Sequence, residues 1–248
     1  RRVLFRSEHA EGDSAARLQA LVSPFVLRRV KEDVVADLPE KIEDTVMAQL
    51  TGEQRKLYLA NQDRIAQQVQ YREASEFKKD KLKVLAELTK LRQICCDPHL
   101  HYADYKAGSA KLDTCMELVH GALDGGHRIL LFSQFTGMLD IIGKRLVKED
   151  IAFLKLTGAS SKESRAKMVA QFQAGEVPVF LISLKAGGVG LNLTAADVVI
   201  HYDPWWNVAA QDQATDRAHR IGQQHTVTVY KLIAKDTIEE RIMQDRKS

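Results

Sequence analysis

The chain of 248 residues contains only three cysteines, Cys95, Cys96 and Cys115. Three cysteines are too few for the disulfide framework of a small secreted protein, and their odd number fits a reducing compartment. No apolar run approaches the roughly 18–20 residues that a membrane-spanning helix needs, and no charged-then-apolar signal segment opens the chain. We therefore expect a soluble intracellular protein.

The sequence also lacks an excess of charge of one sign. Its 36 Lys and Arg residues are nearly balanced by 33 Asp and Glu residues, which gives a formal net charge of +3. This total neither requires nor excludes nucleic acid as a partner, because a basic face can lie within a balanced chain. With 45% hydrophobic residues the composition is that of a globular protein, with length for one large domain or two small ones.

Several catalytic motifs are absent. No G-x-x-x-x-G-K-[S/T] phosphate-binding loop is present, since the stretch GMLDIIGKR has the wrong spacing between its glycines. Asp-Glu does not occur as a dipeptide, so the metal-holding and water-activating carboxylates of an ATPase are also missing. There is no G-x-S-x-G elbow and no C-x-x-C pair. We expect that this chain alone cannot hydrolyse ATP.

One short stretch, CCDPHLH, has the residue types of a zinc site. It places Cys95, Cys96, His99 and His101 within seven residues. Adjacent cysteines are a poor start for a tetrahedral site, and no second Cys/His pair follows. We expect buried cysteines at a helix end and ordinary loop histidines, with no bound metal.

Changes in the predicted secondary structure divide the chain into three parts. Residues 1–16 form an N-terminal segment, and we treat residues 1–7, RRVLFRS, as an artefact outside the fold. Residues 17–107 are rich in predicted helix. In residues 108–248 strands and helices alternate, which indicates a separate domain.

The helix-rich part contains one predicted strand. A helix over RLQALVSPFVLRRVKEDV leads into KIEDTVMAQL, whose alternation is typical of a strand. Thr51 and Gln54 have the spacing of a capping box that would open a long charged helix. A second helix follows and ends where Asp97 and Pro98 stop it, so we expect an antiparallel helix pair.

The third part holds five apolar strands that end in polar or glycine residues. They lie in RILLFSQF, AFLKLTG, PVFLIS, DVVIHYD and TVTVYKLIA. Strands separated by helices predict an α/β fold with a parallel sheet flanked by helices on both faces. Because the carboxyl ends of parallel strands meet at one edge, we expect one site there, formed by Ser133, Gln134, Thr157, Gly158, residues 183–190 and residues 203–207.

Two features of this edge have an affinity for anions. The loop SLKAGGVG can present backbone N–H groups to a phosphate, although a turn that needs positive φ explains its glycines equally well. Arg217 and Arg220 would share a helix face, where they repel each other unless a carboxylate or a phosphate lies between them. An arginine pair without a phosphate-binding loop describes half of a phosphoryl-transfer site, to which a second domain contributes the rest.

Seven stretches occur in the order found in the Swi/Snf-related ATPases of helicase superfamily two: SPFVLRRVKEDV, LRQICCDPHL, ILLFSQFT, LKLTGASS, SLKAGGVGLNLTAAD, DPWWN and QATDRAHRIGQ. Nearly the whole chain resembles the second RecA-like lobe of such a DNA translocase, together with the segment that joins the two lobes. In that family the phosphate-binding loop and the Asp-Glu pair lie on the first lobe.

The resemblance implies roles for individual residues. Arg217 and Arg220 would be arginine fingers at the nucleotide, with Gln213 beside them, and Gly188 and Gly190 would belong to the loop that couples the nucleotide to DNA. The implied contacts to the DNA backbone are Ser133, Gln134, Thr157, Gly158, Ser183, Leu184, Lys185 and Trp206.

Two positions near these stretches leave room for other interpretations. Trp206 fits a DNA contact and core packing about equally well, whereas Trp205 is expected in the core. Many relatives have proline where Val208 stands, and Asn207 can still cap the helix that follows.

The resemblance also implies cofactors and partners. ATP and Mg²⁺ would be bound mainly by the first lobe. The partners would be double-stranded DNA, the first RecA-like lobe of the same polypeptide, and a DNA-bound protein such as RNA polymerase. The compact lobe favours a bacterial cytoplasm, on the nucleoid, over a eukaryotic nucleus. A second function stays open, a non-catalytic module of RecA-like fold that binds nucleic acid or protein.

Overall fold

The computed structural model describes residue 21 and residues 38–70, 74–186 and 190–245. The chain divides into two units, Arg1–Asp37 and Leu38–Ser248, and the second contains the fold described below. The helix predicted over residues 17–34 lies outside the described residues except for Leu21, which is helical. Residues 1–16 lie outside them altogether.

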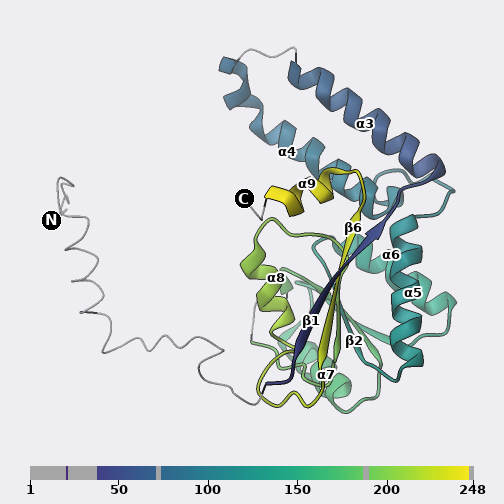
Figure 1. The fold of residues 1–248 in the computed structure, drawn as a ribbon, viewed down its shortest axis with the longest axis vertical. Coiled ribbons are helices and arrows are strands. Elements are labelled where there is room, and N and C mark those ends of the chain that lie inside the picture. Colours follow the sequence, from purple (N-terminus) through teal and green to yellow (C-terminus); the bar gives the residue numbers. More distant parts are fainter. Residues whose placement is uncertain (1–20, 22–37, 71–73, 187–189, 246–248) are drawn as a thin grey trace. The chain divides into compact units, whose positions relative to one another are not determined.

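A parallel sheet of six strands forms the centre of the second unit (Figure 1). Its order is β1-β6-β5-β2-β4-β3. The strands are β1 (Lys41–Ala48), β2 (Ile129–Ser133), β3 (Phe153–Leu156), β4 (Val179–Ser183), β5 (Val198–His201) and β6 (Val227–Ala234). All five strands predicted after residue 107 are present, and the predicted α/β fold with a parallel sheet is confirmed.

The strand predicted in the helix-rich part, β1, belongs to this same sheet. It pairs with β6 along its whole length, from Lys41 opposite Val227 to Ala48 opposite Ala234. The expected sheet was therefore short by one edge strand. Alternation of apolar residues identifies a strand, but it carries no information about a pairing partner so distant in the sequence.

Helices cover both faces of the sheet, as predicted. They are α5 (Ala110–Asp124), α6 (Thr136–Lys148), α7 (Lys162–Gln173) and α8 (Val208–Thr215). Ile129 and Leu131 pack with residues of α5 and α6, whereas Leu130 and Phe132 pack with residues of α7 and α8. Burial on both faces explains why the central strands are apolar throughout.

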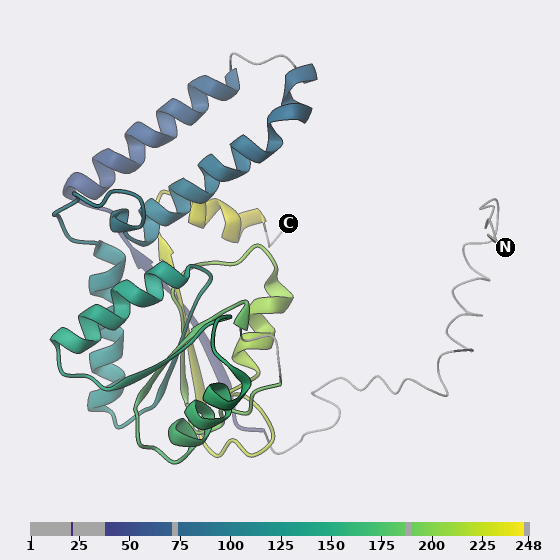
Figure 2. The same ribbon diagram turned by 180° about the vertical axis from the view of Figure 1, so that it is seen from behind.

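An antiparallel helix pair packs at the carboxyl end of β6 and is visible from both sides (Figures 1 and 2). It consists of α3 (Gly52–Gln70) and α4 (Ala74–Cys96), and the short helices η1 (Pro98–Leu100) and α9 (Ile238–Asp245) lie nearby. Asp97 ends α4 as predicted, because its carboxylate accepts a hydrogen bond from the His99 N–H at 2.8 Å and caps η1. No described helix is long and apolar enough to span a membrane.

The capping box predicted from Thr51 and Gln54 is wrong. The Gln54 side chain is 1% exposed and points away from its own helix end. Its Nε2 donates to the Ile94 carbonyl at 3.0 Å, and its Oε1 accepts from the Ala110 N–H at 3.1 Å. Tertiary packing overrides the local pattern here. A buried amide needs hydrogen-bond partners for both its nitrogen and its oxygen, and Gln54 finds them in distant segments. Ala110 begins α5, a helix that was not predicted.

Candidate nucleotide and nucleic-acid interface

The carboxyl edge of the sheet brings together three of the predicted positions. Ser133 ends β2 directly opposite Ser183, which ends β4. Thr157 follows β3, whose last residue, Leu156, lies opposite Ile182. The strands thus place the hydroxyl residues of three loops along one edge, as parallel pairing requires.

Ser133 is buried, and its hydroxyl is used within the protein. Its Oγ donates to Asp203 Oδ1 at 2.5 Å, and the same carboxylate oxygen accepts the Gln134 N–H at 3.3 Å. Burial raises the pKa of Asp203, opposed by this hydrogen bond and by the charges of Lys111 and Arg92. Asp203 therefore ties the end of β2 to the end of β5, a role that sequence reasoning missed. A lone Asp at a strand end gives no signal of it.

The loop after β4 is held in a similar way. Ser183 is buried, and its Oγ accepts the Ala186 N–H at 3.3 Å. Arg165 of α7 donates from Nη1 to the Ala186 carbonyl at 3.0 Å. Lys185, between these anchors, is exposed, and Leu184 is half-buried. The loop thus has a fixed backbone with one cation directed to solvent.

Two of the predicted site glycines are exposed: Gly158, predicted to contact DNA, and Gly190, predicted to belong to the loop that couples the nucleotide to DNA. Apart from the chain neighbours, no atom of the described residues lies within 4 Å of the position that a Cβ would occupy on either glycine. A bulky ligand can therefore approach their backbone closely. Gly188 lies outside the described residues. Thr157 is half-buried, with its Oγ1 accepting the Ala159 N–H at 3.4 Å.

Arg217 and Arg220 do not share a helix face, so that prediction is wrong. The helix begins after Asn207, which caps it as expected, and ends at Thr215. The arginines follow in a turn whose backbone is held by distant segments, because the Arg217 carbonyl accepts the Leu193 N–H at 3.0 Å. Helix α8 starts after the carboxyl end of β5 and runs toward the amino end of that strand. The arginine turn at its end therefore lies near the loop that precedes β5, away from the carboxyl edge. The structure therefore does not bring the arginines to the edge where the sequence analysis expected them.

The two guanidinium groups differ in environment. Arg217 is 4% exposed, and its Nε has no hydrogen-bond partner in the described part of the chain. Burial lowers the pKa of Arg217, and the charge of Arg220 lowers it further. Arg220 itself is exposed, as is Gln213 on α8. The arrangement is a buried cation beside a second, accessible one.

The two tryptophans follow Asp203 in the loop after β5. Trp206 is 54% exposed, which favours a surface role over core packing. Trp205 is only partly buried, so the expectation that it belongs to the core is not met in full. The Arg92 guanidinium lies 5.7 Å from the Trp206 ring centroid. Sequence reasoning assigned no role to Arg92, although it lies in LRQICCDPHL.

The residues of CCDPHLH face inward or pair locally. Cys95 and Cys96 are buried, and burial raises the pKa of both thiols. His99 Nδ1 lies 2.7 Å from Asp97 Oδ1. Over the described ranges, no three His, Cys, Asp or Glu side chains are grouped so that they could hold a metal ion.

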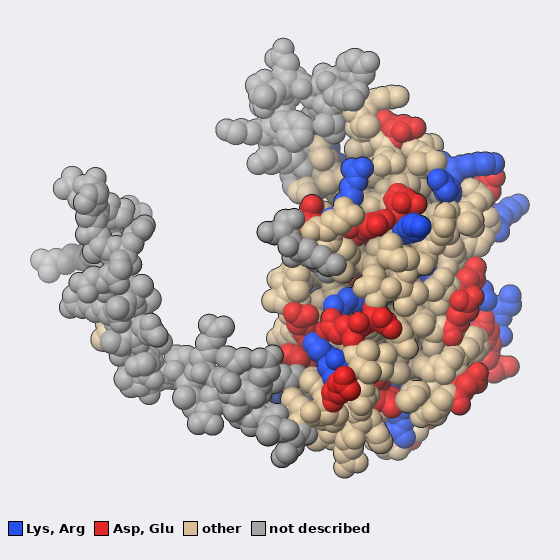
Figure 3. Space-filling model, in the orientation of Figure 1, with Lys and Arg blue, Asp and Glu red and all other residues tan. Residues whose placement is uncertain are grey.

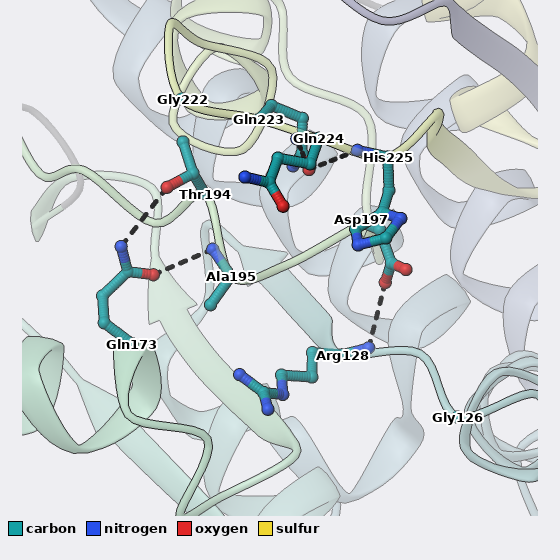
Figure 4. Close-up of a pocket in the computed structure, with 10 residues that line it drawn as sticks. All are labelled: Gly126, Arg128, Gln173, Thr194, Ala195, Asp197, Gly222, Gln223, Gln224 and His225. Atoms are coloured by element: carbon teal, nitrogen blue, oxygen red, sulfur yellow. Dashed lines mark hydrogen bonds between the residues drawn. The ribbon is translucent and has the colours of Figure 1, made fainter.

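A polar pocket of about 390 Å³ lies at the amino ends of β2, β5 and β6 (Figure 4). Arg128, Gln173, Asp197 and His225 contribute side chains to its wall. No predicted site residue lines it. On the face of the molecule seen in Figure 3, basic and acidic side chains are interspersed. Neither the pocket nor the charge distribution indicates a different location for the predicted site.

Two family models match the chain. Residues 110–222 match the helicase conserved C-terminal domain, and residues 2–100 match the SNF2-related domain. An uncharacterized ATP-dependent helicase of Mycoplasma pneumoniae is 42% identical over 92% of this chain and 22% of its own length. The putative ATP-dependent helicase/translocase YwqA of Bacillus subtilis is 41% identical over 91% of this chain and 25% of its own. The chain thus spans at most a quarter of these relatives.

Solved structures agree with these matches. The C-terminal domain of the Sulfolobus solfataricus SWI2/SNF2 ATPase superposes with a TM-score of 0.69 and 35% identity, over 83% of this chain and 84% of that one. The ATPase core from the same organism in complex with dsDNA gives 0.73 and 37%, over 94% of this chain and 50% of that one. The chain therefore belongs to the SNF2-related family of helicase-like ATPases and has the RecA-like fold of their C-terminal domains.

Proposed function

We propose that this chain is the second motor lobe of an ATP-dependent translocase on double-stranded DNA, with residues 17–107 joining it to the first lobe. The observation that carries the proposal is the buried guanidinium of Arg217 beside Arg220. A buried cation with an unpaired donor is costly unless a counter-charge completes it. The charge of Asp216 offsets this cost only in part, and an anion that arrives with another domain would complete the pairing.

The donors present fit the γ-phosphate of ATP. Guanidinium groups bind phosphate oxygens well, and the exposed Arg220 can reach an anion held by a facing lobe while Arg217 keeps its place. ATP supplies the phosphoanhydride bond whose hydrolysis drives the motor. Mg²⁺ would be held by the first lobe, which in this proposal also carries the phosphate-binding loop and the Asp-Glu pair. Gln213 lies on the helix that leads into the arginine turn.

The carboxyl edge suits a DNA backbone. Gly158, Gly190, Lys185 and Trp206 are exposed there, and small residues, loop N–H groups and a cation grip phosphates without reading sequence. Ser133 and Ser183 have hydroxyls occupied inside the fold, so we assign them the shaping of these loops. The half-buried Gln134, Thr157 and Leu184 complete the proposed surface.

A covalent path connects the two sites. The segment that follows Ser183 passes Lys185 and Gly190 at the DNA surface and reaches Leu193, whose N–H bonds the Arg217 carbonyl. A shift of the arginines on lobe closure would therefore move the DNA loop, which is how we propose that hydrolysis becomes a step. The partner on DNA, such as RNA polymerase, would be displaced on a bacterial nucleoid or in a nucleus.

A triplex-displacement assay tests this proposal. The longest natural chain that contains these residues is given ATP and a DNA duplex carrying a third strand at a distance from the loading end. We expect ATP-dependent release of the third strand, and none with a non-hydrolysable analogue. Binding of DNA without release, at any ATP concentration, would instead support the non-catalytic module.

A further inference from the structure

Arg92 of α4 lies between two loops of the proposed DNA edge. Its side chain is 4% exposed, and its guanidinium carbon is 5.7 Å from the ring centroids of both Phe135 and Trp206. Its Nη2 donates a hydrogen bond to the Pro204 carbonyl. One side chain thus contacts the loop after β2 and the loop after β5.

These contacts join segments far apart in the chain. β2 and β5 are neighbours in the sheet, so the loops that leave them lie side by side, and Arg92 reaches both from the helix-rich part. Residue 92 precedes the stretch that matches the helicase C-terminal domain, which begins at residue 110. The exposed Trp206 ring therefore rests on a side chain from outside that domain.

Packing alone does not explain an arginine at this position. Arg92 Nε is buried without a hydrogen-bond partner among the described residues, a cost that an apolar side chain of similar length would avoid. A planar guanidinium can lie against aromatic rings while it donates within its plane, which a lysine ammonium cannot do. The chemistry fits a group that fixes the orientation of Trp206 and of the Pro204 backbone.

We infer that Arg92 is a positioning residue, which holds Trp206 and the loop after β5 in the orientation that grips DNA. The inference rests on the proposed function of this edge. According to this inference, α4 contributes to DNA affinity through Arg92, which acts on Trp206 and does not contact the nucleotide.

The first test measures the environment of Trp206 by fluorescence and does not depend on enzymatic activity. In the 248-residue chain the only tryptophans are Trp205 and Trp206, so Trp205→Phe leaves one reporter. In that background we expect Arg92→Met and Arg92→Lys to shift Trp206 emission to the red and raise its quenching by acrylamide. Arg64→Ala, which removes an exposed arginine paired with Glu87 on the neighbouring helix, should change neither. Unchanged Trp206 emission in both Arg92 variants overturns the inference.

The second test separates DNA affinity from turnover in the longest natural chain. We expect both Arg92 variants to raise the DNA concentration that half-saturates ATP hydrolysis about tenfold, because neither Met nor Lys can lie flat against the rings while it donates to the Pro204 carbonyl. The rate at saturating DNA should fall much less, because the arginine pair is untouched. Arg92→Lys keeps the charge and decides the outcome if Arg92→Met does not fold.

The two possible failures are distinguishable. If the unsubstituted chain shows no DNA-stimulated hydrolysis, the proposed function fails whatever Arg92 does. If DNA stimulates hydrolysis and both Arg92 variants behave like Arg64→Ala, the function stands and the positioning role is wrong. A variant that loses maximal rate with unchanged half-saturation also contradicts the inference.

Discussion

Lys111 Nζ lies 2.5 Å from Glu239 Oε2, and both side chains are completely shielded from solvent. The same carboxylate oxygen accepts the Ala234 N–H at 2.9 Å, and the ammonium lies 5.3 Å from the centroid of the Tyr202 ring. The pair joins α5 to α9 and to the end of β6. Burial alone would lower the pKa of Lys111, but the charge of Glu239, its hydrogen bond and the nearby Cys96 and Asp203 together raise that pKa.

Removing one partner of this pair should be far worse than removing both. Lys111→Met or Glu239→Leu alone leaves a buried charge without its counter-charge, and each should lower the free energy of unfolding by about 3–5 kcal/mol. The double variant should be more stable than either single one. Urea denaturation of the four proteins measures this, and single-variant losses below about 1 kcal/mol would contradict it.

Gln54 should matter to stability, and Thr51 should not. Gln54→Ala removes the partners of the Ile94 carbonyl and the Ala110 N–H, so we expect a loss of about 2–3 kcal/mol in the free energy of unfolding. Thr51→Ala should change it by less than about 0.5 kcal/mol, as should Gln67→Ala on the exposed face of α3. An equal loss of unfolding free energy for Thr51→Ala and Gln54→Ala would contradict this prediction and support the capping box.

Glu43 should make stability depend on pH in the acid range. Burial would raise its pKa, but hydrogen bonds from Lys231 at 2.5 Å and Lys41 at 2.7 Å lower it to about 2. Because the folded pKa is depressed, this stabilisation is present above the unfolded pKa near 4.5 and is lost as pH falls toward 2.

The variant Glu43→Gln isolates this contribution. Above pH 5 it should be less stable than the unsubstituted protein by about 1 kcal/mol, after allowance for solvent screening of a partly exposed group. The difference should shrink between pH 4.5 and 2. Denaturant unfolding at a series of pH values measures both curves, and a difference that stays constant with pH would rule out the ion pairs as its cause.

Local patterns in the sequence were sufficient for elements whose partners lie nearby. Asn207 caps α8 and Asp97 ends α4 because each side chain bonds a backbone N–H within three residues. The five apolar strands were equally legible, since burial on both faces requires apolar residues. The direction of those strands also predicts that the loops after β2, β3 and β4 lie along the same carboxyl edge.

What the sequence could not supply is contact over long separations. The pairing of β1 with β6, the hydrogen bonds of Gln54 and the contact of Arg92 with the Trp206 ring all depend on tertiary packing. The arginine turn was mispredicted for the same reason. Helical spacing indicated a shared face for Arg217 and Arg220, but the hydrogen bond from Leu193 holds the chain in a turn beyond the end of the helix.

The most direct test of the account is ATP hydrolysis by the longest natural chain, with and without duplex DNA, for Arg220→Ala and for the control Arg241→Ala, which removes an exposed arginine of α9. We predict that DNA stimulates hydrolysis and that Arg220→Ala lowers the stimulated rate by about a thousandfold while ATP still binds. Arg241→Ala should leave both the stimulated rate and ATP binding unchanged. Hydrolysis unchanged by Arg220→Ala would show that the arginine pair serves structure or binding, and the motor mechanism proposed for this lobe would be wrong.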